Sequence, residues 1–373
     1  MVTLASVKLW LDRPWTASSI DSLRGRYADE VRLFEPTKWE WRAAKCVGTM
    51  ARIPGISYSQ KRFLEMRAKR WFNELIAETR PTVVYMNYAW WDWLLDHSRW
   101  ASIRRVVEMH DLVTVNTKMR DKARAHFLAE RIDPASVDDA LLSEGFYDGI
   151  DTPDSSELST YDRYDETVAI CKPEAQIVQK GTQHTRVSVL PASCAVVETA
   201  NACTGPAVFV ASDNPFNLHG YVYFIRRVLP LVLQMVPDFK LMVAGGCCER
   251  VCPTIGVELL GYVEDLTSLY RNSSLAICPV FGGTGQQIKI VEAMAHGLPV
   301  VALQRPASRS PLKHEENGLV AENAEEFASH IVKLWRNREL RRSLGVAAST
   351  TLAKCSDTRT LNILSDVIDG PRE

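Results

Sequence analysis

The chain has 373 residues, a formal net charge of −1 and 46% hydrophobic residues, so it is long enough to form two domains with full cores. The balanced charge argues against a nucleic-acid partner, and the apolar runs fall short of the roughly 18 residues that a membrane-spanning helix needs. The nine cysteines lack the spacing of a disulfide framework and follow no secretory signal. We therefore expect free thiols in a cytoplasmic protein, with peripheral contact with a membrane left open.

Tryptophan is concentrated in the first hundred residues, which hold nine of the ten in the chain. Aromatic faces stack on sugar rings and suit membrane interfaces, although many buried tryptophans simply fill a core. Trp90, Trp91 and Trp93 follow the predicted strand 82–88. Three aromatic side chains so close together cannot all face inward from one strand or helix, so we predict that they bind a ligand at the carboxyl end of this strand.

The first half of the chain has the pattern of βα units. Branched and apolar residues predict strands at 30–34 and 105–109, and residues 60–79 have the period of an amphipathic helix. His110 and Asp111 directly follow the strand 105–109, at the edge of a parallel sheet that faces a ligand cleft. Either side chain could take a proton from an attacking hydroxyl. Equally, Asp111 could cap the next turn while backbone groups satisfy His110.

Two clusters of residues could suggest a metal ion. The three cysteines between residues 247 and 252 have no second Cys or His pair at matching spacing nearby. Asp151 and Asp154 lie in an acidic tract, 131–166, that we interpret as a solvated loop and helix over the surface. We therefore predict no metal site.

The second half repeats the βα pattern after a small, polar stretch, 199–206, that we interpret as a hinge. A buried strand at 207–211 is followed by a polar loop, whose Asn214 and Asn217 can meet sugar hydroxyls or phosphate. An Asn-Pro turn that caps the next helix would explain the same residues equally well. Further strands are predicted at 165–171, 186–191, 240–245, 275–278 and 299–303, and helices at 173–180, 221–235, 266–272 and 325–335.

The most informative stretch is 279–301, whose pattern predicts a glycine turn, a helix and a strand. Glycines at 283 and 285 let the backbone turn tightly and bring unobstructed N–H groups close to a ligand. The helix should begin near Gln286 and end at Gly297. Its positive end and these N–H groups form an anion site at the carboxyl edge of the sheet.

Lys289 and Glu292 are three residues apart, so they share one face of this helix. The lysine can carry a pyrophosphate, and the carboxylate can accept hydrogen bonds from both hydroxyls of a ribose. This spacing fits a nucleoside diphosphate that lies along the helix start. The alternative is an exposed ion pair, which contributes only ~0.3 kcal/mol, beside glycines that merely form a turn.

The segment Gly-Thr-Gly-x-x-x-Lys-x-x-Glu-Ala-Met-Ala-x-Gly-x-Pro-Val-Val, residues 283–301, resembles the donor-binding segment of GT-B glycosyltransferases, in the branch that builds bacterial and viral polysaccharides. The resemblance implies contacts of Lys289 with the donor phosphates and of Glu292 with the ribose. Many relatives have a second Glu where this chain has Thr284, which puts the family's contact with the transferred sugar in doubt. The donor-binding turn would consist of Gly283, Thr284, Gly285 and Gln286.

The resemblance also implies an α/β fold of two Rossmann-like, doubly wound parallel-sheet domains that face each other across a cleft. Residues 1–201 would form the acceptor-binding domain and residues 202–355 the nucleotide-sugar-binding domain. Residues 356–373 would contain a helix that crosses back to the first domain.

Further substrate contacts follow from the same resemblance. His110 and Asp111 resemble a His-Asp pair of the acceptor domain, in which Asp111 would be the base if the reaction inverts the anomeric centre. If the reaction retains it, both would position sugar or acceptor. The additional donor-binding residues would be Asn214 and Asn217, with the backbone of Tyr262 and Val263 on the base. The acceptor-binding residues are expected from their clustering alone, and they are Trp90, Trp91 and Trp93.

We therefore expect a glycosyltransferase that moves a sugar from a nucleoside diphosphate donor, of the UDP or GDP type, to a hydroxyl of a glycan or lipid-linked glycan. No cofactor or metal is implied, because the helix dipole and Lys289 can neutralise the leaving group. Two alternatives stay open. One is a nucleotide-sugar 2-epimerase with the same two-domain fold, and the other is a donor-binding module without transfer activity, which Thr284 makes conceivable.

Overall fold

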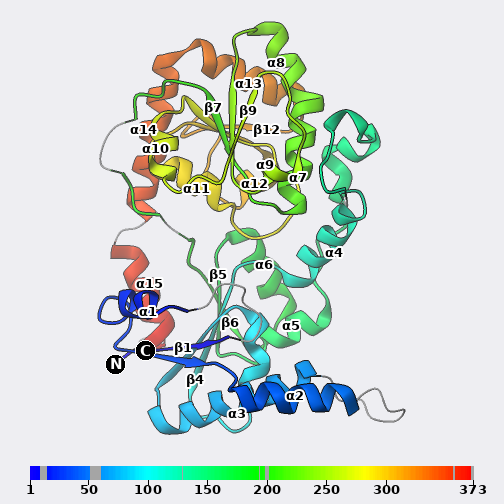
Figure 1. Ribbon diagram of the computed structural model, residues 1–373. Helices are drawn as coiled ribbons and strands as arrows, with labels where there is room; N and C mark the ends of the chain where they lie inside the picture. Colours follow the sequence, from blue (N-terminus) through cyan, green and yellow to red (C-terminus); the bar gives the residue numbers. More distant parts are fainter. Residues whose placement is uncertain are drawn as a thin grey trace. The chain divides into compact units, whose positions relative to one another are not determined.

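The chain forms two compact units, Met1–Arg105 and Val106–Glu373. The computed structural model describes residues 1–8, 15–50, 60–127, 129–192, 194–197, 201–355 and 358–370 (Figure 1). The predicted hinge, 199–206, lies partly outside the described residues. The predicted domain boundary after residue 201 stays a prediction.

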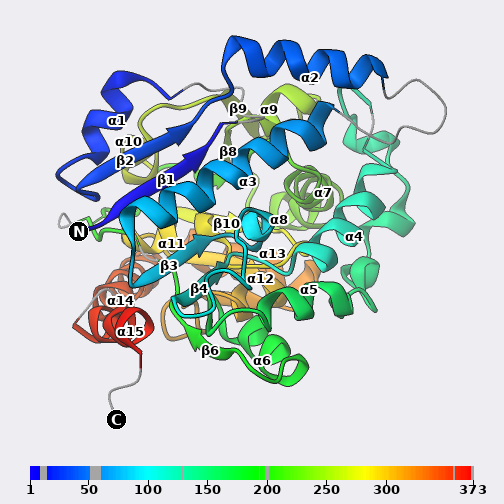
Figure 2. The same cartoon turned by 90° about the horizontal axis from the view of Figure 1, so that it is seen from below.

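The described residues of the first unit form a parallel strand pair, a third strand and three α-helices. Strands β1 and β2 lie side by side, with Thr3 opposite Glu30 and Val7 opposite Phe34 (Figure 2). The strand predicted at 30–34 and the helix predicted at 60–79 are confirmed. The elements are β1 (Thr3–Val7), α1 (Ala17–Leu23), β2 (Glu30–Phe34), α2 (Lys38–Met50), α3 (Gln60–Thr79) and β3 (Val83–Asn87).

The tryptophan triplet lies in a 3-10 helix, η1 (Ala89–Leu94), directly after β3. The Trp90 side chain is 56% exposed. Trp91 and Trp93 are half-buried and their ring centroids are 6.2 Å apart. The expectation that the three rings do not all enter a core is therefore confirmed, while their binding of an acceptor stays a prediction.

The second unit begins with three parallel strands, β4 (Arg104–Met109), β5 (Glu166–Ala169) and β6 (Arg186–Val189), of which β5 pairs with both others. Their hydrophobic side chains are largely buried, as expected for a sheet covered on both faces. The helices between and after these strands are α4 (Val113–Arg124), α5 (Ser155–Tyr161) and α6 (Lys172–Gly181), and 3-10 turns occur at Pro134–Ser136, Asp139–Leu142 and Glu144–Tyr147.

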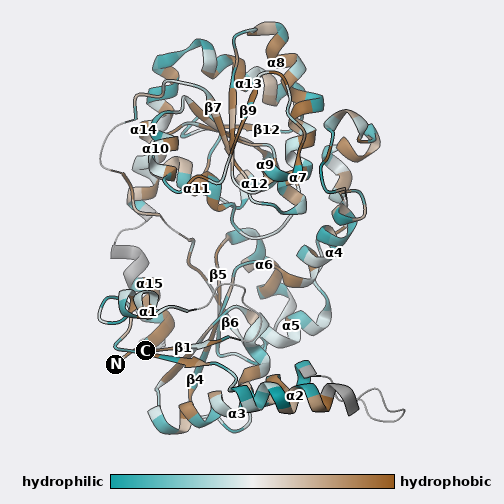
Figure 3. Ribbon diagram, viewed as in Figure 1, coloured by the Kyte–Doolittle hydropathy of each residue, from teal (hydrophilic) through white to brown (hydrophobic). Residues whose placement is uncertain are grey.

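The same unit contains a six-stranded parallel sheet in the order β12-β11-β10-β7-β8-β9. Helices α7, α8 and α13 lie on one side of it and α10, α11 and α14 on the other (Figure 1). The central strands are buried and hydrophobic (Figure 3). The strands are β7 (Ala207–Val210), β8 (Leu241–Ala244), β9 (Val257–Gly261), β10 (Leu275–Cys278), β11 (Val300–Leu303) and β12 (Leu319–Ala321). The helices are α7 (Pro215–Tyr223), α8 (Leu229–Met235), α9 (Cys247–Arg250), α10 (Leu266–Arg271), α11 (Ile288–Ala295), α12 (Gln304–Ser308), α13 (Ala324–Arg336), α14 (Arg338–Cys355) and α15 (Thr358–Asp369), with a π-helical turn at Phe224–Val228.

This strand order is that of a doubly wound sheet, in which the chain winds outward from β7 in one direction and from β10 in the other. The loops that leave β7 and β10 therefore diverge to opposite faces of the sheet. In such sheets, ligands bind in the crevice that opens between the two diverging loops. Among the described residues, every helix is too short or too polar to cross a membrane.

The acidic tract, 131–166, runs over the surface as the sequence predicts, and most of residues 131–148 are exposed. It is fastened to the six-stranded domain at a few places. Arg226 donates hydrogen bonds to the backbone carbonyls of Pro134, Ala135 and Val137 at 2.9–3.1 Å, and the Tyr147 side chain is fully buried.

Candidate functional site

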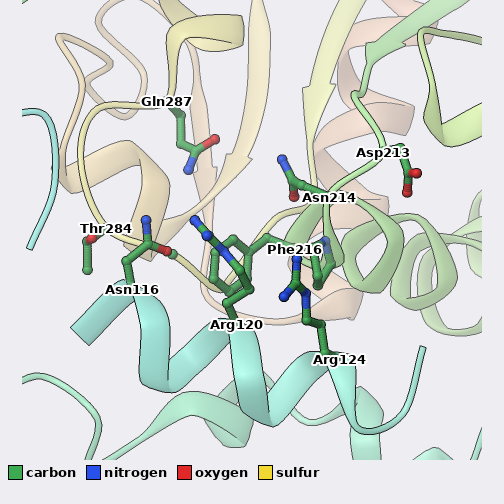
Figure 4. Close-up of a pocket in the computed structure, with 10 residues that line it drawn as sticks. Asn116, Arg120, Arg124, Asp213, Asn214, Phe216, Thr284 and Gln287 are labelled. Carbon is green, nitrogen blue, oxygen red and sulfur yellow. The ribbon is translucent and has the colours of Figure 1, made fainter. Parts of the chain in front are cut away.

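A polar cavity of about 340 Å³ lies where the loops after β7 and β10 diverge (Figure 4). Its volume falls within the range of small-molecule sites. Three elements form its walls: helix α4, the start of helix α7 and the glycine turn before helix α11. The lining residues are Asn116, Arg120, Arg124, Asp213, Asn214, Pro215, Phe216, Gly283, Thr284 and Gln287.

Helix α4 presents three polar residues to the cavity at a spacing of four (Figure 4). Residues at this spacing lie on one face of a helix, so Asn116, Arg120 and Arg124 form a row. Asn116 is buried, and its Oδ1 has no hydrogen-bond partner among the described residues. This row is not among the predicted site residues, although its spacing and its place after His110 and Asp111 are visible in the sequence.

The start of helix α4 is held by a buried carboxylate, Glu157 of helix α5. Its oxygens accept hydrogen bonds from the backbone N–H groups of Val113 at 2.6 Å and Thr114 at 2.9 Å. Tyr161 also donates its hydroxyl to this carboxylate, at 3.0 Å. Because the first N–H groups of a helix lack partners within the helix, Glu157 both satisfies them and complements the helix dipole.

The second wall is the start of helix α7, where Asn214 is the N-cap residue. Its Oδ1 accepts a hydrogen bond from the Asn217 backbone N–H at 2.9 Å. Asn214 therefore caps helix α7, which is one of its two predicted roles. It also lines the cavity, so the other predicted role, a contact with sugar hydroxyls or phosphate, stays open. The neighbouring Asp213 carboxylate forms an ion pair with Arg250 at 2.9 Å, so its negative charge is largely compensated.

The third wall is the glycine turn. Gly283 and Gly285 have φ values of +90° and +76°, which L side chains rarely adopt. A Cβ atom at Gly285 would overlap the His110 carbonyl oxygen. The Thr284 hydroxyl exchanges hydrogen bonds with the backbone of Leu112, accepting from its N–H at 3.2 Å. The turn is therefore packed directly against the segment that follows β4.

The Gly285 N–H group, predicted to face an anion, donates to the Glu174 carboxylate at 2.5 Å. Glu174 is buried and also accepts from the Arg309 guanidinium at 3.1 Å. Burial raises the pKa of Glu174, and both hydrogen bonds oppose this rise. An acidic side chain of the protein thus occupies this one N–H group, while Gly283, Thr284 and Gln287 still line the cavity.

Helix α11 begins at Ile288 with Gln287 as its N-cap, two residues later than predicted, and ends before Gly297 as expected. Lys289 donates to Asn217 Oδ1 at 2.5 Å and is not among the residues that line the cavity. Burial lowers the pKa of this lysine. Asn217 in turn donates to Ser212 Oγ at 3.0 Å, so a hydrogen-bond chain leads from the lysine to the loop after β7.

Glu292 is half-buried one turn further along helix α11 and accepts a hydrogen bond from the Tyr270 hydroxyl at 3.3 Å. Gln286 is half-buried, and its Oε1 has no partner in the described part of the chain. Tyr262 is 78% exposed after β9, an edge strand two places from β7, and neither it nor Val263 lines the cavity. Their predicted donor contacts stay predictions.

His110 and Asp111 follow β4, as predicted, and lie beside Gly285. Asp111 Oδ2 accepts a hydrogen bond from Asn116 Nδ2 at 2.5 Å, whereas Oδ1 is buried without a partner among the described residues. Burial raises the pKa of Asp111, and the Asn116 hydrogen bond opposes this rise. His110 Nε2 lies 3.5 Å from the Glu108 carboxylate. Asn116 thus connects the predicted base to the cavity wall.

The two aspartates considered as metal ligands have basic partners instead. Asp151 forms an ion pair with Arg305, and Asp154 forms one with Lys118 at 2.6 Å. Cys247 and Cys248 are buried free thiols, and burial raises the pKa of both.

Residues 206–337 match the family model described as glycosyl transferases group 1. The putative glycosyltransferase EpsD of Bacillus subtilis is 24% identical over 148 residues, which are 37% of this chain and 39% of that protein. A phosphatidyl-myo-inositol mannosyltransferase of Mycobacterium leprae is 33% identical over 123 residues, which are 30% of this chain and 33% of that protein. The chain thus covers between a third and two fifths of the length of these relatives.

Among solved structures, Anabaena Alr3699/HepE in complex with UDP-glucose is similar in fold. Its TM-score is 0.60, its identity is 13%, and the match covers 99% of each chain. The predicted α/β fold class, that of GT-B glycosyltransferases, is confirmed by this likeness and by the parallel sheets. The predicted resemblance to group 1 glycosyl transferases is confirmed for residues 206–337.

The close packing of the glycine turn gives a direct test. Gly285→Ala should lower the free energy of unfolding by roughly 2–5 kcal/mol, because the left-handed backbone costs ~1–2 kcal/mol and overpacking adds ~1–3 kcal/mol. Gly149→Ala is the matched control, since Gly149 has a similar φ of +78° with open space around it. It should cost about 1–2 kcal/mol, the backbone cost alone.

Urea unfolding at equilibrium measures both variants. Equal losses of stability for Gly285→Ala and Gly149→Ala would contradict the proposed contact between the glycine turn and the backbone after β4.

Proposed function

We propose that this chain is a glycosyltransferase that moves a sugar from a nucleoside diphosphate sugar to a hydroxyl of a glycan or lipid-linked glycan. The observation that carries the proposal is the polar cavity at the point where the loops after β7 and β10 diverge, two of whose three walls belong to the segment that matches group 1 glycosyl transferases. The Mycobacterium leprae relative is named for mannosyl transfer to phosphatidyl-myo-inositol, which supports a lipid-linked acceptor.

The departing nucleoside diphosphate needs positive charge close to its phosphates. Helices α7 and α11 both direct their N-termini at the cavity, through Asn214 and Gln287. Lys289 does not line the cavity, but hydrogen bonds through Asn217 and Ser212 connect it to Asn214, which does. We propose that these groups replace a metal ion in stabilising the leaving group, where the loss of one such donor commonly costs ~3 kcal/mol.

Asp111 is the proposed base if the reaction inverts the anomeric centre. It is largely buried beside the cavity wall and keeps one carboxylate oxygen without a partner among the described residues, so that oxygen can accept a proton from an acceptor hydroxyl. In a retaining reaction the same oxygen would hold the sugar or the acceptor. Its environment suits either role.

The epimerase alternative is less well supported, since the matched family and the named relatives are glycosyl transferases. A donor-binding module without transfer activity would have the same cavity and would differ from the enzyme only in failing to transfer the sugar. The expectation of a cytoplasmic location, with or without contact with a membrane surface, stays a prediction.

Incubation of the chain with UDP- and GDP-sugars, with and without lipid-linked glycan acceptors, tests the function. We expect release of nucleoside diphosphate that depends on the acceptor and persists in EDTA. A sugar isomer that forms without acceptor would favour the epimerase. Tight binding of nucleotide with neither hydrolysis nor transfer would favour the binding module.

The phosphate role of Lys289 is tested by Lys289→Ala. We expect a loss of up to about tenfold in affinity for nucleoside diphosphate, because Lys289 acts on the cavity through Asn217 and a hydrogen bond to a charged group contributes roughly 1.5 kcal/mol. Lys333→Ala is a control on helix α13, where the lysine pairs with Glu315 at the surface. Unchanged affinity in Lys289→Ala, measured by titration calorimetry, would remove the phosphate role.

The pH dependence of transfer tests Asp111. A base acts in its ionised form, so the rate should fall as the pH drops through the pKa of Asp111, which burial raises above its usual value. Asn116→Ala removes a hydrogen bond that favours the ionised form, so the acid limb of kcat/KM should move to higher pH.

Asp111→Asn should abolish the acid limb together with most of the activity. An acid limb that stays at the same pH in Asn116→Ala, or a wild-type rate in Asp111→Asn, would dismiss Asp111 as the base.

A further inference from the structure

We propose that Arg120 and Arg124 of helix α4 bind the diphosphate of the donor. This proposal rests on the proposed function and deepens it. The two arginines lie outside residues 206–337, the segment that matches the glycosyl transferase family, and outside the motif that carries Lys289. The chain would thus hold the donor phosphates with cations from a helix that the sequence motif does not include.

Both arginines lie where a bound diphosphate could reach them. Arg120 and Arg124 are one helical turn apart, and both side chains rise from helix α4 toward Asn214, Phe216 and Gln287 (Figure 4). Two guanidinium groups at this spacing can each donate to a different phosphate of a diphosphate. Within the described part of the chain, neither group has a hydrogen bond or an ion pair of its own.

The residues that line the cavity carry an excess of positive charge. Asp213 is the one acidic residue that lines it, and its carboxylate is paired with Arg250 at 2.9 Å, outside the lining set. The two arginines therefore leave an excess of positive charge in the cavity. The N-termini of helices α7 and α11 add to this excess, so the cavity favours a ligand with more than one negative charge.

Helix α4 is held firmly at both ends. This matters because an anion site needs donors that are already in place. Helix α4 is held at its start by Glu157 and by the Leu112 contact with Thr284. Beyond its last turn, Arg250 donates to the Ala129 carbonyl oxygen at 2.9 Å. Both ends of the helix are thus fastened to elements that carry the cavity.

The two arginines differ in depth, and this difference orients the ligand. Arg120 is half-buried and close enough to Asp111 to favour its ionised form, whereas Arg124 is exposed. Since Asp111 marks the acceptor side, Arg120 would contact the phosphate that carries the sugar, and Arg124 the phosphate next to the nucleoside. The sugar would then point toward Asp111.

Titration calorimetry with UDP and GDP tests the proposal on the full chain. Arg120→Gln and Arg124→Gln should each weaken binding about tenfold or more and reduce its salt dependence, because each removes one charged contact. Lys118→Gln is the matched control: it removes the same charge from the same helix, but from an exposed lysine paired with Asp154. It should bind like wild type.

Arg124→Lys, which keeps the charge, should recover part of the lost affinity, and circular dichroism shows that each variant is folded. Because Arg124 is exposed, we expect its variants to fold. They therefore test whether the row on helix α4 binds diphosphate even if Arg120→Gln fails to fold. Wild-type affinity in folded Arg124→Gln would overturn the inference while leaving the proposed function intact. A wild-type chain that binds neither UDP nor GDP would overturn both.

Discussion

The site depends on one backbone contact, the packing of the glycine turn before helix α11 against the segment that follows β4. Gly285 lies against the His110 carbonyl group, where no side chain fits, and the Thr284 hydroxyl bonds to the backbone of Leu112. The buried Glu174 carboxylate closes the same contact by accepting from the Gly285 N–H group. This contact brings the predicted base, helix α4 and the donor-binding turn to one place, although more than 170 residues separate them in the chain.

Several buried polar atoms near this contact lack a hydrogen-bond partner among the described residues, as do others away from it, such as Ser274 Oγ. Asp111 Oδ1, Asn116 Oδ1 and Gln286 Oε1 are buried acceptors without partners among the described residues. An unsatisfied buried acceptor costs roughly 1–3 kcal/mol, so several of them at one place are a cost that folding alone does not explain. Of the three residues, Asn116 lines the cavity.

The segment that matches the glycosyl transferase family forms only part of the cavity wall. The matched segment, 206–337, supplies the walls made by helix α7 and the glycine turn, whereas helix α4 lies outside it. The basic side chains of the cavity come from helix α4. The segment with the donor motif thus forms two walls of the cavity, while the basic side chains of the cavity come from another part of the chain.

The sequence by itself determined the local elements and the class of fold. Alternating and branched residues predicted β2, β4 and the central strands, and Gly297 predicted the end of helix α11, because these features depend on neighbours along the chain. Only the tertiary structure decided which side chains share the cavity. Glu174 carries no local signal of its partner Gly285, which lies 111 residues further along the chain. Arg120 and Arg124 likewise share the cavity with residues of helix α7 and the glycine turn that are distant in the sequence. For the same reason Lys289, placed correctly on its helix by the sequence, bonds to Asn217 of helix α7, a partner that no periodicity indicates.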